Sequence, residues 1–231
     1  MITNFFNEIL NMLFPRACIG CGTKNTLLCS NCIKKIPALP LACFFCGGES
    51  LTTICLSCRD RYGSNLDEVF AAVPYEHPVI KKAVKLFKYH NQKQLSQLLG
   101  KLICRRISAP IRHFNKNELI LIPIPLSKQR LRDRGYNQAE LLAKYVSQQM
   151  SIRIEENLLQ KIRHTPSQVS IGHREERLRN LKGSFMVVDK SLVNNKTVIL
   201  IDDVATTGAT LIEAGYVLKP VSYTHLTLPT N

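Results

Sequence analysis

The sequence predicts an α/β protein in which helices flank a parallel sheet, with a small metal-binding segment in front of it. Residues 198–201 are four consecutive apolar residues, mostly β-branched, as in a fully buried parallel strand. Residues 119–125 form a second apolar run, which ends at prolines that cannot continue a strand ladder. Residues 18–58 hold eight cysteines in four Cys-x-x-Cys pairs, and a segment this short cannot build its own core.

The composition bounds the class of protein and its partners. A chain of 231 residues is long enough for one full domain and a small one. Its net charge of +14 predicts anionic partners, and phosphorylated metabolites and nucleic acids both qualify. No apolar run is long enough to span a bilayer, and Glu8 interrupts the N-terminal apolar segment, which argues against a secretory signal. We therefore expect a cytoplasmic protein, whose nine cysteines favour metal binding over disulfides.

An amphipathic helix is expected over residues 1–14, ended by Pro15. Its polar face lacks the Lys and Arg of a membrane-surface helix, so packing on the rest of the protein is favoured over docking to a membrane or partner. The apolar positions at helical spacing are Ile2, Phe5, Phe6, Ile9, Leu10 and Leu13.

The cysteine pairs predict zinc sites within residues 15–60, since zinc closes its shell with four thiolates. Glycine follows the first pair of each set of two pairs, which suggests two consecutive ribbons. Interleaved pairing, or a single occupied site, stays open. One or two structural zinc ions are expected. The eight ligands are Cys18, Cys21, Cys29, Cys32, Cys43, Cys46, Cys55 and Cys58.

Residues 77–117 contain ten Lys or Arg residues and no Asp or Glu. Apolar positions in 79–87 and 95–103 predict two amphipathic helices separated near 89–91. A run of lysines is usually a solvated face. Because no acid compensates this one, attraction of a nucleic acid or a phosphate ligand is an equal alternative.

The first expected strand, 119–125, leads into a basic loop at 127–138 and then a helix that reaches residue 150. Four cations in seven residues can neutralise a diphosphate, and arginine can grip its oxygens bidentately. An ordinary exposed loop is the alternative interpretation. The four cations are Lys128, Arg130, Arg132 and Arg134.

Three further segments follow before the last strand. Residues 152–162 are expected to contain a second strand, and 185–188 a third, so that 198–201 is the fourth. The polar segment 164–180 is too long for a passive connection and is interpreted as a mobile lid. Its candidate ligand-contacting residues are Gln168, Arg174 and Arg177.

The stretch after residue 201 carries the clearest chemistry. Asp202 and Asp203 suit ribose hydroxyls or a magnesium ion, and a small-residue loop at a helix start suits a phosphate. The alternative interpretation is a buried strand that ends in an Asp-rich turn and has no ligand-binding role. The run closely resembles the phosphoribosyl pyrophosphate (PRPP) signature of phosphoribosyltransferases, which implies that the acids hold the ribose and the loop the 5′-phosphate. The loop residues are Ala205, Thr206, Thr207, Gly208, Ala209 and Thr210.

Several stretches together resemble one family, the ComF-type proteins. The most specific are 134–143 and 202–210, and the resemblance covers about residues 10–219. It implies a double zinc ribbon fused to a type I phosphoribosyltransferase-like fold, here over 68–219, that uses Mg²⁺ with PRPP. It also implies handling of single-stranded DNA in natural transformation, or use of DNA as a nutrient. The other matching stretches are Pro15, 87–89, 122–125, 165–168 and 177–180.

The segment 220–231 departs from that family. Pro220 stops the preceding helix, and the expected glycine turn and final apolar strand are replaced by a polar sequence. We expect this tail to be foreign, a translated linker or adapter, in which case an edge strand is absent.

Three hypotheses of function remain. The first is a transferase that uses PRPP, whose acceptor and general base no residue identifies. The second is a non-catalytic module that binds a nucleotide or the 5′-phosphate end of single-stranded DNA. The third is an adaptor whose ribbons dock a competence helicase or a recombination partner. We favour a PRPP-binding protein that serves DNA uptake.

Overall fold

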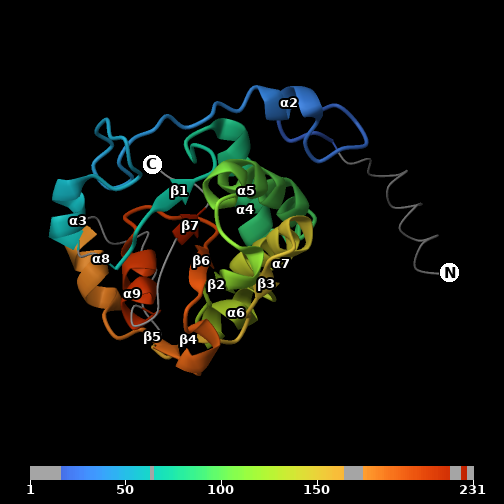
Figure 1. Cartoon of the computed structure of the whole chain (residues 1–231). Helices are drawn as coiled ribbons and strands as arrows, with labels where there is room; N and C mark the ends of the chain where they lie inside the picture. Colours follow the sequence, from blue (N-terminus) through green and yellow to red (C-terminus); the bar gives the residue numbers. More distant parts are fainter. Residues whose placement is uncertain (1–16, 63–64, 164–173, 219–224, 228–231) are drawn as a thin grey trace.

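Figure 1 shows the computed structural model of the chain, which describes residues 17–62, 65–163, 174–218 and 225–227. The helix expected over 1–14 and the expected lid residue Gln168 lie outside these ranges. Among the helices that are described, none combines the length and the apolar character needed to cross a membrane.

A three-stranded parallel sheet in the order β3-β2-β6 lies at the centre. Its middle strand β2 (Leu119–Pro123) pairs with β3 (Arg153–Ile154) on one side and with β6 (Thr197–Ile201) on the other. All of β2 and the last four residues of β6 are buried, as in strands that have helices on both faces. The strands expected at 119–125 and 198–201 are confirmed.

The two faces of this sheet belong to two separate cores. Leu121 and Ile199 pack with the apolar sides of α4 (Pro78–Tyr89), α5 (Leu95–Ile111) and α7 (Gln138–Met150), whereas their chain neighbours Ile122 and Leu200 pack with α9 (Ala209–Leu218). Alternate side chains of a strand point to opposite faces, so one apolar run feeds both cores. The α/β class with helices on both sides of a parallel sheet is therefore confirmed (Figure 1).

Two of the helices on the first face match the expected amphipathic pair, separated at residues 90–94. The crossing of α5 and α7 is close, because a Cβ on Gly100 would lie 2.4 Å from Cδ1 of Tyr145. The first face carries α4 (Pro78–Tyr89), α5 (Leu95–Ile111) and α7 (Gln138–Met150), and the second carries α9 (Ala209–Leu218) and α8 (Arg174–Leu181).

The expected second and third strands do not both join the sheet. Region 152–162 splits, so that β3 extends the central sheet while β4 (Leu159–Lys161) pairs antiparallel with β5 (Phe185–Val187). In this antiparallel pair Leu159 and Phe185 are buried, and Gln160 and Met186 are exposed. Strands with only one apolar face suit an antiparallel pair better than a doubly covered sheet.

A parallel pair of short strands was not expected. Strand β1 (Val69–Ala71) pairs with β7 (His225–Thr227), which lies beside β6 (Figure 1). Strand β7 falls within the segment 220–231, so part of the tail adopts a strand where none was expected. Its foreign origin stays a prediction, because backbone pairing does not report where a sequence comes from.

The cysteine-rich part supplies α2 (Ser30–Lys34) and α3 (Leu56–Tyr62), which lie far apart in Figure 1. Residues around α2 join the core on the α4–α5 face, and residues around α3 join the core that contains α9. The two ribbons therefore cover opposite faces of the sheet. Single 3₁₀ turns at Lys116–Glu118 and Lys190–Val193 precede β2 and β6. The domain limits 15–60 and 68–219 stay predictions.

Candidate functional site

The eight cysteines form two clusters of four, and each cluster contains two consecutive pairs. Within each cluster the Sγ atoms all lie within 4.8 Å of one another. The consecutive pairing is thus confirmed and interleaved pairing is excluded. Four converging thiols suit tetrahedral zinc. The clusters are Cys18, Cys21, Cys29 and Cys32, and Cys43, Cys46, Cys55 and Cys58.

Backbone N–H groups support thiolates in both clusters. The Cys29 N–H donates to Cys18 Sγ at 3.3 Å, and the Cys55 N–H donates to Cys43 Sγ at 3.4 Å. Burial acts to raise the pKa of Cys18, but hydrogen bonds, chiefly from the Cys29 backbone, lower it to about 6. Burial and the neighbouring sulfurs raise the pKa of Cys32 to about 12. A divalent cation at the centre would lower it, so the donor set fits a metal.

The two adjacent acids stand at the carboxyl end of β6, next to two cations from other elements. Asp203 is only 9% exposed, and its Oδ1 lies 2.9 Å from Lys88 Nζ at the end of α4. Its Oδ2 lies 4.0 Å from Nη1 of Arg134. The Asp203 N–H donates to Oδ1 of Asp202 at 2.8 Å, which locks the two acids together. The fold thus places a compact charged cluster at the sheet edge.

Asp202 has a strongly raised pKa. Burial raises its pKa to about 7, the negative charge of Asp203 adds to this effect, and Lys88 opposes it.

This raised pKa predicts a pH-dependent stability. The unfolded chain releases the Asp202 proton near the ordinary pKa, while the folded chain keeps it until about pH 7, so the free energy of unfolding falls as pH rises between these values. Asp202→Asn removes that loss, so the variant should gain about 1–2 kcal/mol relative to wild type between about pH 5 and about pH 8. Urea unfolding at both pH values measures this. Asp60→Asn, at an exposed carboxylate, is the control, and an equal difference at both pH values for Asp202→Asn would refute the assignment.

The small-residue loop after the acids opens helix α9. Gly208 has a φ of +74°, a left-handed conformation that turns the chain into the helix. Thr206 is exposed, and its Oγ1 accepts a hydrogen bond from Nη1 of Arg177 at 2.9 Å. The loop is therefore reachable at Thr206 and contacted there by α8, the described part of the expected lid. Arg174 is the first residue of that helix.

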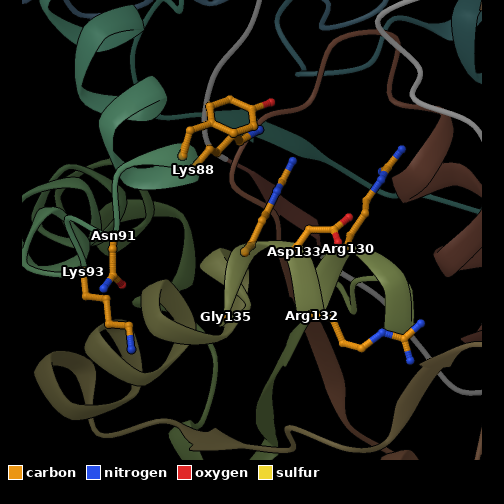
Figure 2. Close-up of a pocket in the computed structure, with 9 residues that line it drawn as sticks. Lys88, Asn91, Lys93, Arg130, Arg132, Asp133 and Gly135 are labelled. Carbon is orange, nitrogen blue, oxygen red and sulfur yellow. The ribbon is translucent and has the colours of Figure 1, made fainter.

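Figure 2 shows a cavity of about 600 Å³ whose wall shares two residues with the ion pairs of Asp203. Lys88 and Arg134 belong both to its wall and to the Asp203 ion pairs, so the cavity and the acids form one site. Five cationic side chains and one carboxylate make the cavity strongly positive. Its lining residues are Lys88, Tyr89, Asn91, Lys93, Arg130, Arg132, Asp133, Arg134 and Gly135.

The expected basic loop is a short helix, α6 (Lys128–Arg134). Its start is capped by Ser127, whose Oγ accepts from the Arg130 N–H at 3.4 Å, and its end is turned by Gly135 at φ +74°. The prediction of a loop was wrong because the serine cap and the glycine stop outweigh the charge density between them.

The four expected cations have different neighbours in this helix. Arg134 pairs with Asp203, and Arg130 lies close enough to feel the charge of Asp203. Burial, followed by the charge of Arg134, lowers the pKa of Arg130. Arg132 extends away from Lys88 in Figure 2, and its Nη2 donates to Gln129 at 2.8 Å. Lys128 is exposed and is not part of the cavity wall. The structure brings two of the four to the acid pair.

Sequence reasoning missed two cationic residues of the site. Lys88 was noted only as part of the basic segment 77–117 and of the stretch 87–89, not as a site residue, and Lys161 on β4 was not considered. Burial, and next the charge of Arg130, lowers the pKa of Lys161 to about 8, while the charge of Asp202 opposes this. Tyr89 lies under Arg134, with 5.4 Å between the guanidinium carbon and the ring centroid. No local sequence signal marks such convergence, apart from the excess of lysines in 77–117.

No family model matches the chain. It is 29% identical over 193 residues to competence protein ComFC of Bacillus subtilis, covering 80% of this chain and 74% of that protein. It is 25% identical over 146 residues to the DNA utilization protein YhgH of Escherichia coli K12, covering 61% of each. A solved hypoxanthine phosphoribosyltransferase from Staphylococcus aureus aligns with 60% of this chain and 62% of its own, at 16% identity and a TM-score of 0.34, a likeness too distant to carry an assignment.

One relative is similar over almost the whole of both chains. Competence protein F of Haemophilus influenzae is 32% identical over 225 residues, which cover 94% of this chain and 93% of that protein. A match of this extent includes both the cysteine-rich part and the α/β part of the chain. The chain therefore belongs to the competence protein F family, which includes ComFC.

Proposed function

We propose that the chain supports the handling of single-stranded DNA during uptake in natural transformation, and that its α/β part binds PRPP with Mg²⁺. The relatives named for competence and for DNA utilization support a competence-related function. One observation supports PRPP as the ligand. Lys88 and Arg134 line the cationic cavity and at the same time contact Asp203, so an anion-binding wall adjoins a pair of sugar-binding acids.

Each part of PRPP has a matching group in this arrangement. The 5′-phosphate would meet the backbone of residues 205–210 and the Thr206 hydroxyl, and the ribose hydroxyls would meet Asp202 and Asp203. The diphosphate would occupy the cavity beside Arg130. Carboxylate oxygens of the acid pair are of the kind that Mg²⁺ takes, and the ion would add positive charge at the diphosphate.

The same groups would favour transfer over mere binding. Negative charge grows on the diphosphate as its bond to the ribose breaks, and fixed cations such as Lys88 and Arg134 stabilise that charge more than the reactant. Positive charge grows on the ribose, where the ionised acids offset it. Helix α8, with Arg177 on Thr206, lies where it can limit access of water to the loop.

Calorimetry with PRPP and Mg²⁺ tests the proposal. Asp203→Asn should weaken binding at least about 10-fold, because it removes a sugar ligand and releases the two cations that its charge orients. Asp60→Asn makes the same chemical change at an exposed carboxylate that does not line the cavity and should leave the affinity unchanged. Absence of heat with wild type, or equal losses in both variants, would refute PRPP binding at this site.

A second candidate, a non-catalytic single-stranded DNA module, is favoured by the face that continues from the cavity along α4. Lys82 and Lys85 are exposed there, and Tyr89, 64% exposed, stands at the cavity mouth. Aromatic rings beside cations are typical of surfaces on which bases stack while phosphates bind. The two candidates share the cavity and differ in what fills it.

Salt dependence separates the two candidates. Oligothymidylate binding should weaken linearly on a log–log plot against salt, and Lys82→Ala with Lys85→Ala should reduce the slope by about 1–2. PRPP affinity should be insensitive to these two changes, because neither lysine lines the cavity. Oligonucleotide binding without PRPP binding would leave only the second candidate.

A further inference from the structure

The two cysteine clusters differ in the residues between their first two ligands. In the first cluster Cys18 and Cys21 enclose Ile19 and Gly20, and in the second Cys43 and Cys46 enclose two phenylalanines, Phe44 and Phe45. Both tight turns continue into a glycine with a left-handed φ, Gly22 at +79° and Gly47 at +72°. The backbone is thus repeated, while the side chains presented at the turn are not.

Both rings of the second turn press on the candidate phosphate loop. Phe44 and Phe45 are 8% and 6% exposed and belong to the same buried core as Ala205 and Leu211. A Cβ placed on Gly208 would lie 2.7 Å from Cε1 of Phe45 and 3.0 Å from Cε1 of Phe44. Only a glycine fits here, so the rings bear directly on the backbone of the loop.

The rings are themselves held on several sides. They pack edge to face with centroids 5.3 Å apart, and Phe45 lies 5.0 Å from the ring of Tyr62 at the end of α3. The Phe44 N–H donates to the carbonyl of Thr53 at 2.8 Å. Because both residues sit between two ligands of one cluster, a metal that binds Cys43 and Cys46 fixes the peptide that carries them.

The first cluster makes no such connection among the contacts of the described residues. A Cβ on Gly20 would meet Cys32 Sγ at 2.7 Å and Val79 of α4 at 3.2 Å, on the opposite face of the sheet from α9. The equivalent turns therefore serve different neighbours. One faces the helix layer of α4 and the other faces the loop that begins α9.

We propose that Phe44 and Phe45 are positioning residues for the loop 205–210, and that metal binding by the second cluster, not the first, sets the order of this loop. The consequence for anion binding rests on the proposed function. Backbone amides bind a phosphate well only when they are held in place beforehand, and a displacement of about 1 Å is costly. Without a metal, nothing joins the four sulfurs of the cluster, so the turn is no longer fixed. The two rings are then no longer held against Gly208.

Hydrogen exchange on the zinc-loaded full chain tests the positioning. In the double variant Phe44→Leu with Phe45→Leu, amides of 203–212 should exchange at least about 10-fold faster, while amides of 139–150 in α7 stay unchanged. Zinc content by mass spectrometry should stay as in wild type. Ile19→Ala, at the equivalent position of the first turn, is the matched control and should leave the loop protected. Unchanged loop exchange in the double variant, or equal change in the control, would overturn the proposal.

A pair of ligand variants tests the role of the metal and guards against a misfolded phenylalanine variant. Cys46→Ser and Cys21→Ser each remove an exposed ligand, one from each cluster, and each should lower the zinc content by one ion. Only Cys46→Ser should lose protection at 203–212, and only it should weaken binding of PRPP with Mg²⁺, by about 10-fold. Loss of loop protection in Cys21→Ser alone would refute the assignment. If wild type does not bind PRPP, the exchange result still decides the positioning, so the two failures are distinguishable.

Discussion

Replacing Lys88 with alanine is expected to lower the free energy of unfolding by about 3 kcal/mol, because the change leaves a buried carboxylate without its main partner. The side chains of Lys88 and Asp203 are only 16% and 12% exposed, and their charged atoms lie 2.9 Å apart. Arg134, at 4.0 Å, is too far to replace the lysine fully. The same change removes a cation from the cavity wall, so the affinity for PRPP should fall together with the free energy of unfolding.

Urea unfolding near neutral pH measures this loss, and two further variants identify its cause. Lys85→Ala, one turn earlier on α4 and exposed, should change stability by less than about 0.5 kcal/mol. Adding Asp203→Asn to Lys88→Ala should restore much of the stability, since no charge is then left unpaired. Additive losses in the double variant would show that the pair does not act as a buried ion pair.

Each chain is expected to carry two zinc ions, and their removal to cause the largest loss of stability of any treatment. Cysteines of both clusters are buried in the two cores, Cys18 and Cys32 in one and Cys43 and Cys58 in the other. Zinc binding to such sites contributes about 10–16 kcal/mol in isolated zinc-finger peptides, so chelation should lower the melting temperature by more than about 10 °C. Metal analysis and calorimetry before and after chelation measure both quantities.

Cys104 provides the control for the zinc prediction. It lies within α5, outside both clusters, so Cys104→Ser should keep two zinc ions per chain and respond to the chelator as wild type does. A stoichiometry of one, or a melting temperature that survives complete metal removal, would contradict the structural role of the second ion.

Local patterns predicted the long elements and the short strand β5, but missed β1, β7 and α6. Apolar spacing gave α4 and α5, and the apolar runs gave β2 and β6, because burial imposes a period on the sequence. Strands β1 and β7 have three residues each, too few to show a period, and they form by pairing with each other. Helix α6 was expected as a loop because its cap and stop residues were given less weight than its charge.

The sequence by itself determined the eight cysteine ligands and the acid loop, because their groups lie close together along the chain. It left the pairing of the cysteines open, and the structure decided that each cluster contains two consecutive pairs. Tertiary structure alone decided that Lys88 reaches Asp203 and that Phe44 and Phe45 press on Gly208. These partners are separated by more than a hundred residues, and packing of the ribbons and helices on the sheet, not any local preference, sets their distance.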